Sequence, residues 1–238
     1  MSDPSALAET AARRLMARVG QSTGRYAVAL TGGSTPQPLY ELLTKQPYRG
    51  RLPWDRIHWF WGDDRFVPQN HPDSNFAMAR HILLDQVGVP PDHIHPIPTH
   101  AGDPDGAGQL YEAELKRFYG KDRLEAGHPL FDLTLMGVGI DGHTASLFPG
   151  AVGLKETQRW VIGVDTAGLA PFVPRVTLTF PTLACAREML FIISGYEKQS
   201  IVRRMFSGED LPASRAYCDG DLVWLIDRTV LPEKPHVT

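Results

Sequence analysis

The feature that most constrains the fold is a series of short apolar runs separated by segments with helical spacing. The runs are continuously apolar and do not alternate with polar residues, which is typical of strands buried on both faces of a parallel sheet. They are "YAVAL" (26–30), "IHWFW" (57–61), "FDLTLM" (131–136), "WVIGV" (160–164), "VTLTF" (176–180), "MLFIIS" (189–194) and "LVWLI" (222–226). The pattern predicts an α/β fold with a mostly parallel, doubly wound sheet and helices on both faces.

Helical patterns follow several of these runs, at 36–43, 74–87 and 197–206, and an amphipathic helix is predicted near the N-terminus. The Pro- and Gly-rich stretches 87–108 and 164–174 are interpreted as surface loops. A length of 238 residues suits one large α/β domain, so a single domain over residues 1–238 is expected.

Charge and cysteine content exclude several classes of protein. The formal net charge is -3 and no run of five like charges occurs, so neither nucleic acid nor an acidic membrane surface is an expected partner. Only Cys185 and Cys218 are present, which gives no disulfide framework or thiolate metal site. Without a signal peptide or an apolar run of bilayer length, a cytoplasmic protein is expected.

Chemistry-bearing residues follow four of the predicted strands directly. The segments are "TGGSTP" (31–36), "GDDR" (62–65), "GVGIDGH" (137–143) and "GYEK" (195–198). Because the carboxyl ends of parallel strands share one edge of a sheet, and ligands of such sheets bind there, the four segments predict one common site.

The segment 137–142 contains the pattern G-x-G-x-x-G, which also occurs in dinucleotide-binding folds. That fold requires a long helix after the glycines, but Pro149 and Gly150 end any helix that starts near His143. The glycines are therefore interpreted as forming a tight turn that exposes Asp141 and His143.

The segment 31–36 predicts a site for a phosphate or carboxylate group. Gly32 and Gly33 allow positive φ and close approach of the backbone, and Thr35 is expected to cap a helix with Pro36 at its first position. Backbone N–H groups and the helix dipole then face the anion together. No G-x-x-x-x-G-K-[ST] motif is present, which argues against nucleoside triphosphate chemistry.

Three motifs together, "LTGGSTPQPLY" (30–40), "WFWGDDRFVPQNHPDSN" (59–75) and "GVGIDGHTASLFPG" (137–150), resemble the 6-phosphogluconolactonases. The resemblance extends over roughly residues 5 to 230. It implies a modified Rossmann-like sheet shared with glucosamine-6-phosphate deaminase and ribose-5-phosphate isomerase. It also implies a small sugar phosphate lactone as substrate, with no metal and no organic cofactor.

Carried over by motif, the resemblance implies a reacting centre and a phosphate site. The reacting centre would contain Asp63, Arg65, Asp141 and His143, and the phosphate site Gly32, Gly33, Ser34, Thr35, Arg175 and Lys198. The family pattern D-E-R is D-D-R here, with Asp64 as the shorter acid. The related deaminases carry a catalytic glutamate five residues after the histidine, where this chain has Phe148. That difference favours the lactonase.

Opening a lactone with water requires a base for the water and charge stabilisation for the oxyanion. His143 suits the first role, since an imidazole accepts protons near neutral pH. Either Asp141 or Asp63 would fix its tautomer, and Arg65 would bind phosphate or polarise the carbonyl; the sequence leaves both choices open. The sequence contains no G-x-S-x-G motif, the pattern that would indicate a covalent serine nucleophile.

Three other interpretations are less favoured by the residues. A glucosamine-6-phosphate deaminase or isomerase would need the carboxylate that Phe148 replaces, and a non-catalytic sugar-phosphate sensor would need an output module, which is not visible in the sequence. The three histidines of "HIHPIPTH" (93–100) lie in an extended, proline-rich stretch with no nearby fourth ligand, so zinc is not predicted. The oligomeric state is open, and a monomer is compatible with the sequence.

Overall fold

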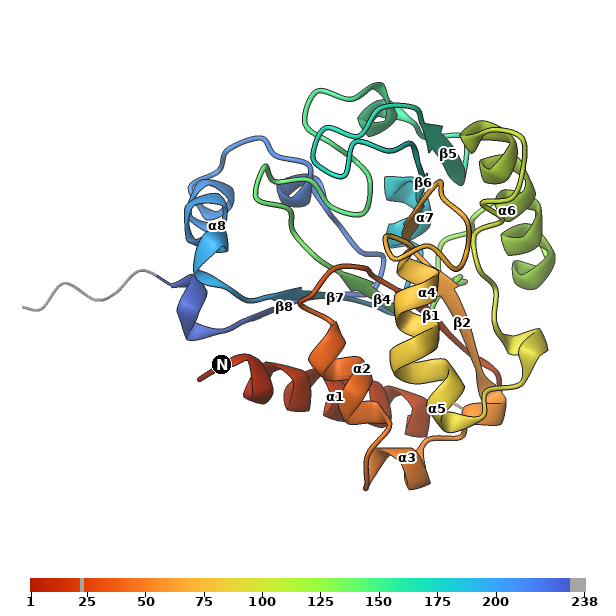
Figure 1. The fold of residues 1–238 in the computed structure, drawn as a ribbon, viewed down its shortest axis with the longest axis vertical. Coiled ribbons are helices and arrows are strands. Elements are labelled where there is room, and N and C mark those ends of the chain that lie inside the picture. The colour runs from red at the N-terminus through yellow and green to blue at the C-terminus, as the bar shows by residue number, and fades with distance from the viewer. Residues whose placement is uncertain (22–23, 232–238) are drawn as a thin grey trace, which may run out of the picture.

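The computed structural model describes residues 1–21 and 24–231. Within them, five strands form a parallel sheet in the order β2-β1-β4-β7-β8 (Figure 1). They are β1 (Tyr26–Leu30), β2 (Ile57–Trp61), β4 (Leu133–Met136), β7 (Glu188–Ile193) and β8 (Asp221–Ile226). The predicted α/β class and parallel sheet are confirmed. The predicted domain limit at 238 lies outside the described residues, and the single domain stays a prediction.

A second, antiparallel sheet lies above the main sheet in the view of Figure 1. It contains β3 (Asp63–Arg65), β6 (Arg175–Leu178) and β5 (Val161–Val164), in that order. The prediction that 160–164 and 176–180 belong to the parallel sheet is therefore wrong. Both strands are covered by α6 (Pro104–Tyr119), and an apolar run reports such burial without reporting strand direction.

Most of the remaining helices lie in the predicted segments, but those at 48–51 and 180–184 were not predicted. The remaining helices are α1 (Pro4–Gln21), α2 (Gln37–Leu43), α3 (Tyr48–Arg51), α4 (Asn75–Ala79), α5 (Asp85–Val87), α7 (Phe180–Ala184) and α8 (Gln199–Phe206), with a π-helical turn at 80–84 joining α4 to α5. The stretch 87–108 is not loop throughout, because α6 begins at Pro104. The Asp103 side chain accepts a hydrogen bond from Gly106 N and caps that helix.

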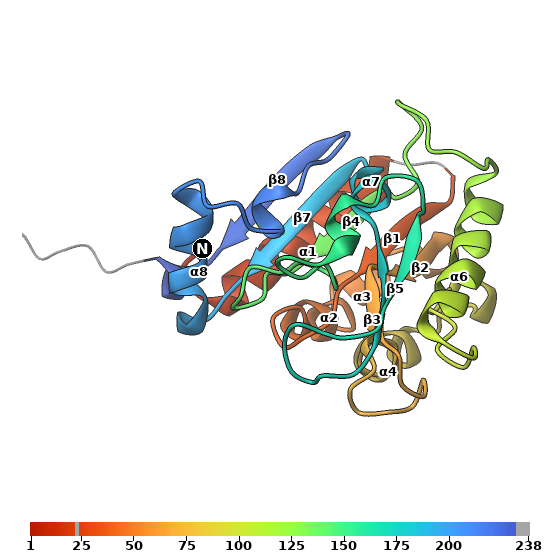
Figure 2. The same cartoon turned by 90° about the horizontal axis from the view of Figure 1, so that it is seen from above.

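Helices and sheets pack around one hydrophobic core that runs from Leu7 to Val230. α1 contacts β7 and β8 and lies below the main sheet in Figure 1, whereas α6 packs against the small sheet and, through Phe118, against Phe60 of β2. Figure 2 shows the main sheet from above, with α1 running beneath it. No helix in the described ranges is long and apolar enough to cross a membrane.

The main sheet has a topological switch point between β1 and β4. The chain passes from β1 to β2 on one side and later returns to β4 on the other, so the loops after β1 and β4 separate and leave a crevice. Gly62, directly after β2, joins the two sheets. Its N–H donates to the carbonyl oxygen of Leu30 at 2.9 Å, and its own carbonyl accepts from Leu178 N at 2.8 Å. The switch point and this junction together position the site.

Candidate active site

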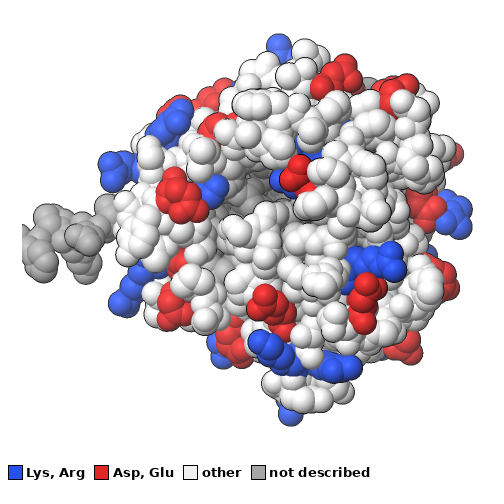
Figure 3. Space-filling model, viewed as in Figure 1, with Lys and Arg blue, Asp and Glu red and all other residues white. Residues whose placement is uncertain are grey.

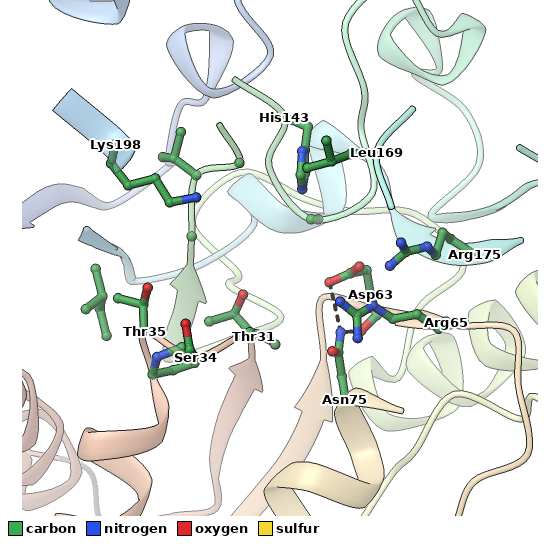
Figure 4. Close-up of a pocket in the computed structure, with 18 of the residues that line it drawn as sticks. Thr31, Ser34, Thr35, Asp63, Arg65, Asn75, His143, Leu169, Arg175 and Lys198 are labelled. Carbon is green, nitrogen blue, oxygen red and sulfur yellow. Dashed lines mark hydrogen bonds between the residues drawn. The ribbon is translucent and has the colours of Figure 1, made fainter. Parts of the chain in front are cut away.

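A cavity of about 230 Å³ lies at the carboxyl ends of the central strands. Figure 3 shows a hollow on this face, and Figure 4 shows the side chains that line it. All the predicted site residues except Asp141 line the cavity: Gly32, Gly33, Ser34, Thr35, Asp63, Arg65, His143, Arg175 and Lys198. The prediction that four separate strand ends supply one pocket is therefore confirmed.

The turn after β1 forms one wall. Gly33 has φ +88°, as predicted, but Gly32 does not lie in the left-handed region. Residue 32 is instead restricted by space, since an added Cβ would come 1.9 Å from Asn75 Oδ1. The prediction that Thr35 caps the helix is wrong. A turn in which Gln37 N donates to the carbonyl of Ser34 precedes α2, and no side chain caps that helix.

His143 and Asp141 form an imidazole–carboxylate pair. His143 Nδ1 lies 2.5 Å from Asp141 Oδ1, and the same oxygen accepts from His143 N at 3.1 Å. Burial opposes the charge of Asp141, but the hydrogen bonds and charge of His143 outweigh it, so the pKa of Asp141 lies below its ordinary value. Because the carboxylate accepts, Nδ1 is the nitrogen that carries the proton toward Asp141, and Nε2 is the ring nitrogen left to exchange a proton with a ligand. Of the two carboxylates that the sequence left open, Asp141 contacts the imidazole.

The glycines of the 137–143 loop allow this arrangement. A Cβ on Gly139 would lie 2.0 Å from His143 Nδ1, and Gly142 adopts φ +87°. Gly139 N donates to the carbonyl of His143 at 2.8 Å and closes the turn. No helix occurs between residues 137 and 150. The glycines therefore place the imidazole, as the sequence indicated.

Phe148 packs directly against the imidazole. The two ring centroids are 4.7 Å apart, and Phe148 is buried and lines the cavity. The position at which related deaminases carry a glutamate thus holds an apolar ring in contact with His143. In this pocket Phe148 supplies no second acid beside the histidine.

The two aspartates after β2 have different surroundings. Asp63 lines the cavity at 6% exposure, and its Oδ2 accepts from Ser146 Oγ at 2.6 Å. Asp64 points away into the protein, where its carboxylate accepts from the N–H groups of Asn75 and Phe76 at the start of α4. Asp64, the residue that departs from the family pattern, therefore anchors a helix and does not line the pocket.

Three cationic side chains face the cavity: Arg65, Arg175 and Lys198. Among the described residues, none of the three forms an ion pair with a carboxylate. Burial lowers the pKa of Lys198, and burial together with the charge of Arg65 lowers that of Arg175. Arg65 and Arg175 stand opposite each other in the β3–β6 ladder, and in Figure 4 they lie beside Asp63, away from Lys198. The antiparallel direction of β6 explains how a residue at the start of a strand reaches the site.

Two carbonyl oxygens of the 164–174 loop accept hydrogen bonds from the Arg175 guanidinium. Its Nη2 donates to Pro171 O at 2.8 Å and its Nε to Val173 O at 3.2 Å. The same loop places Leu169 in the cavity near His143 (Figure 4). Arg175 therefore holds this loop against the pocket.

Sequence reasoning missed several lining or supporting residues. No role was assigned to Asn75 or Ser146, and Glu197 and Leu169 were not singled out. Asn75 and Ser146 stand inside the quoted motifs. Their proximity to Asp63 depends on contacts between segments distant in sequence, which no local pattern reports.

The histidine-rich stretch 93–100 lies elsewhere. His95 Nδ1 is 2.8 Å from Glu114, and its Nε2 is 3.0 Å from His58 Nδ1. No group of three or more metal-ligating side chains with suitable geometry occurs in the described parts of the chain. The cluster of His58, His95 and Glu114 joins β2 to α6 at the outer edge of the main sheet.

A parallel sheet with a glycine-rich turn (31–36) and an imidazole–carboxylate pair at its switch point defines an α/β protein with a pocket at its strand ends, which is where such sheets bind ligands. Residues 2–224 match the family described as glucosamine-6-phosphate isomerases/6-phosphogluconolactonase, and the chain belongs to that family.

Individual relatives agree with this assignment. A 6-phosphogluconolactonase from Synechocystis is 45% identical over 210 residues, covering 86% of this chain and 83% of its own. The crystal structure of a 6-phosphogluconolactonase from Thermotoga maritima has a TM-score of 0.82 and 30% identity, covering 96% of this chain and 97% of its own. A monomeric glucosamine-6-phosphate deaminase with a TM-score of 0.81 and 21% identity, covering 97% and 96%, shares the fold.

Proposed function

We propose that this protein hydrolyses 6-phospho-D-glucono-1,5-lactone to 6-phosphogluconate, a step of the oxidative pentose phosphate pathway, in the cytoplasm. The observation that carries the proposal is the His143–Asp141 pair, with Nδ1 2.5 Å from Oδ1, whose imidazole lines a pocket that also contains the glycine-rich turn 31–36. Relatives named for this activity, aligned over most of their length, support it. Neither nucleic acid nor membrane takes part.

His143 acts as the general base. With Nδ1–H held by Asp141, Nε2 takes a proton from water as the water oxygen bonds to the lactone carbonyl carbon. The tetrahedral intermediate then collapses: the bond from carbon to the ring oxygen breaks, and the imidazolium returns the proton to that oxygen. Asp141 stabilises the cation that exists between the two steps. No covalent enzyme intermediate is needed.

The cations divide between the two ends of the substrate. Lys198 and the backbone of residues 32–35 bind the phosphoryl group, because an ammonium that faces the cavity and exposed N–H groups suit a dianion. Arg65, beside Asp63, stabilises the oxyanion that develops on the carbonyl. Arg175, assigned to the phosphate by resemblance, lies beside Arg65 and supports the same region.

The test is acid release from freshly prepared phosphogluconolactone, measured above the spontaneous rate. His143→Ala should remove the acceleration while its melting temperature stays near that of the wild type. A fully active His143→Ala enzyme would refute the mechanism, and an inactive wild type would refute the function. Ammonia release from glucosamine 6-phosphate would establish a deaminase, which the contact of Phe148 with His143 opposes. Calorimetric binding of a sugar phosphate without turnover would establish a sensor.

A further inference from the structure

Asn75 contacts two walls of the pocket, the strand β3 and the turn after β1. It is the first residue of α4, is 2% exposed and lines the cavity. Its backbone N–H donates to Asp64 Oδ1 at 2.6 Å, which fixes the residue on the β3 side. Its side chain is hydrogen-bonded to Asp63 (Figure 4), and on its other side it lies against Gly32.

On the Asp63 side, the carboxamide acts as a donor. Nδ2 lies 3.0 Å from the carbonyl oxygen of Asp63 and 3.5 Å from its Oδ1. Both neighbours are acceptors, so the orientation of the amide is determined by its partners. Ser146 Oγ holds the other carboxylate oxygen of Asp63. Asn75 and Ser146 thus restrict this carboxylate from two segments.

On the other side, the carboxamide takes the space that a side chain on residue 32 would need. A Cβ built on Gly32 would lie 1.9, 2.2 and 2.5 Å from Oδ1, Cγ and Nδ2 of Asn75. No residue that carries a side chain fits there without displacing Asn75. The Asn75 side chain therefore limits how closely the turn after β1 approaches Asp63.

The carboxamide oxygen shows that stability alone does not select asparagine here. Oδ1 is buried and has no hydrogen-bond partner within the described residues. A buried acceptor without a partner costs stability, and an apolar side chain of the same shape avoids that cost. Compared with an apolar side chain of the same shape, asparagine adds the hydrogen-bond donor Nδ2.

We propose that Asn75 is a positioning residue of the lactonase reaction: its carboxamide, seated on Gly32, holds Asp63 and sets the distance from Asp63 to the turn after β1. The inference rests on the proposed function. A substrate held by its phosphoryl group at the turn reaches the reacting centre correctly only when this spacing is kept. An error near 1 Å costs about 100-fold in rate, so the loss should fall mainly on kcat.

The experiment compares five proteins by kcat, KM and melting temperature: wild type, Asn75→Ala, Asn75→Leu, Gly32→Ala and the double variant Gly32→Ala/Asn75→Ala. Asn75→Leu keeps the shape and removes the donor, so it should melt near the wild type with kcat reduced about 10- to 100-fold. It also serves if Asn75→Ala fails to fold. Gly32→Ala should lower the melting temperature of the wild type and leave that of Asn75→Ala unchanged, because truncation of Asn75 removes the clash.

The double variant separates positioning from packing. Under the proposal its melting temperature equals or exceeds that of Asn75→Ala, while kcat stays low because Asp63 still lacks its donor. Recovery of kcat together with the melting temperature would overturn the proposal, as would an Asn75→Leu enzyme with wild-type kcat. Asn70→Ala, at an exposed asparagine of the same segment, is the matched control and should change nothing. A wild type without lactonase activity would refute the proposed function, whereas the melting temperatures would still report the Asn75–Gly32 contact.

Discussion

Asp64 provides a sharp prediction, because two opposing effects act on its carboxylate. It is 1% exposed and accepts from Arg65 N (2.7 Å), Asn75 N (2.6 Å), Phe76 N (3.0 Å) and Ser74 Oγ (3.1 Å). Burial opposes its charge and these donors favour it. Burial prevails, aided by the charge of Asp63, and raises the pKa of Asp64 from 3.8 to about 6.

The sign of the effect on stability follows from this pKa. The folded protein binds the proton of Asp64 more tightly than the unfolded chain does, so the contribution of Asp64 to stability is full below pH 3.8 and is lost as the pH rises through 6. Each pKa unit corresponds to roughly 1.4 kcal/mol, so ionised Asp64 costs roughly 3 kcal/mol relative to the protonated form. About 1 kcal/mol of that cost is recovered between pH 7 and pH 5.

Urea unfolding at pH 7 and pH 5 tests this value when wild type and Asp64→Asn are compared. The free energy of unfolding of the wild type should rise, relative to the variant, by about 1 kcal/mol on acidification. Asp122→Asn, at an exposed aspartate, should follow the wild type at both pH values. A wild type that loses stability relative to Asp64→Asn at pH 5 would mean that the four donors outweigh burial, and the reasoning would be wrong.

Three further outcomes are expected. Gly139→Ala should reduce kcat at least 10-fold with little loss of secondary structure by circular dichroism, because its Cβ would displace His143 from a position 2.0 Å away. Ala145→Gly should raise the free energy of unfolding by about 1 kcal/mol in urea, since Ala145 has φ +48°; an unchanged or lower value would show that this conformation is not strained. Burial and the neighbouring histidines lower the pKa of His58 to about 4, so stability should fall as the pH drops from 6.5 towards 4, and fall less in His58→Gln when thermal unfolding is followed across that range.

Local sequence patterns predicted where the strands and helices lie better than they predicted which strands pair with one another. The five strands of the main sheet follow the apolar runs, and α4 lies within the helical pattern predicted at 74–87. The membership of β5 and β6 in a separate antiparallel sheet was not predicted, because burial on both faces gives the same apolar run in either direction. Thr35 failed as a cap because α2 begins at Gln37, one residue later than its composition indicates.

For the pocket, the strand-end rule was sufficient to gather the turn 31–36, Asp63, His143 and Lys198. It did not distinguish the carboxylate beside the imidazole, which required the fold of the 137–143 loop. Nor did it identify Asn75, whose role depends on the absence of a side chain 43 residues earlier in the chain. Contacts of this kind exist only in three dimensions.

Gly62 gives the pocket an unusual mechanical property. The turn 31–36 and His143 follow strands of the main sheet, whereas Asp63, Arg65 and Arg175 stand on the small sheet. Gly62 is hydrogen-bonded to both sheets. The width of the cavity is thus the separation of two sheets, which Gly62 joins directly and which Ser146, in the loop after β4, also joins through its hydrogen bond to Asp63. Because the ladder of each sheet closes within that sheet, a change in the angle between the two sheets would alter the width of the cavity without breaking any strand pairing.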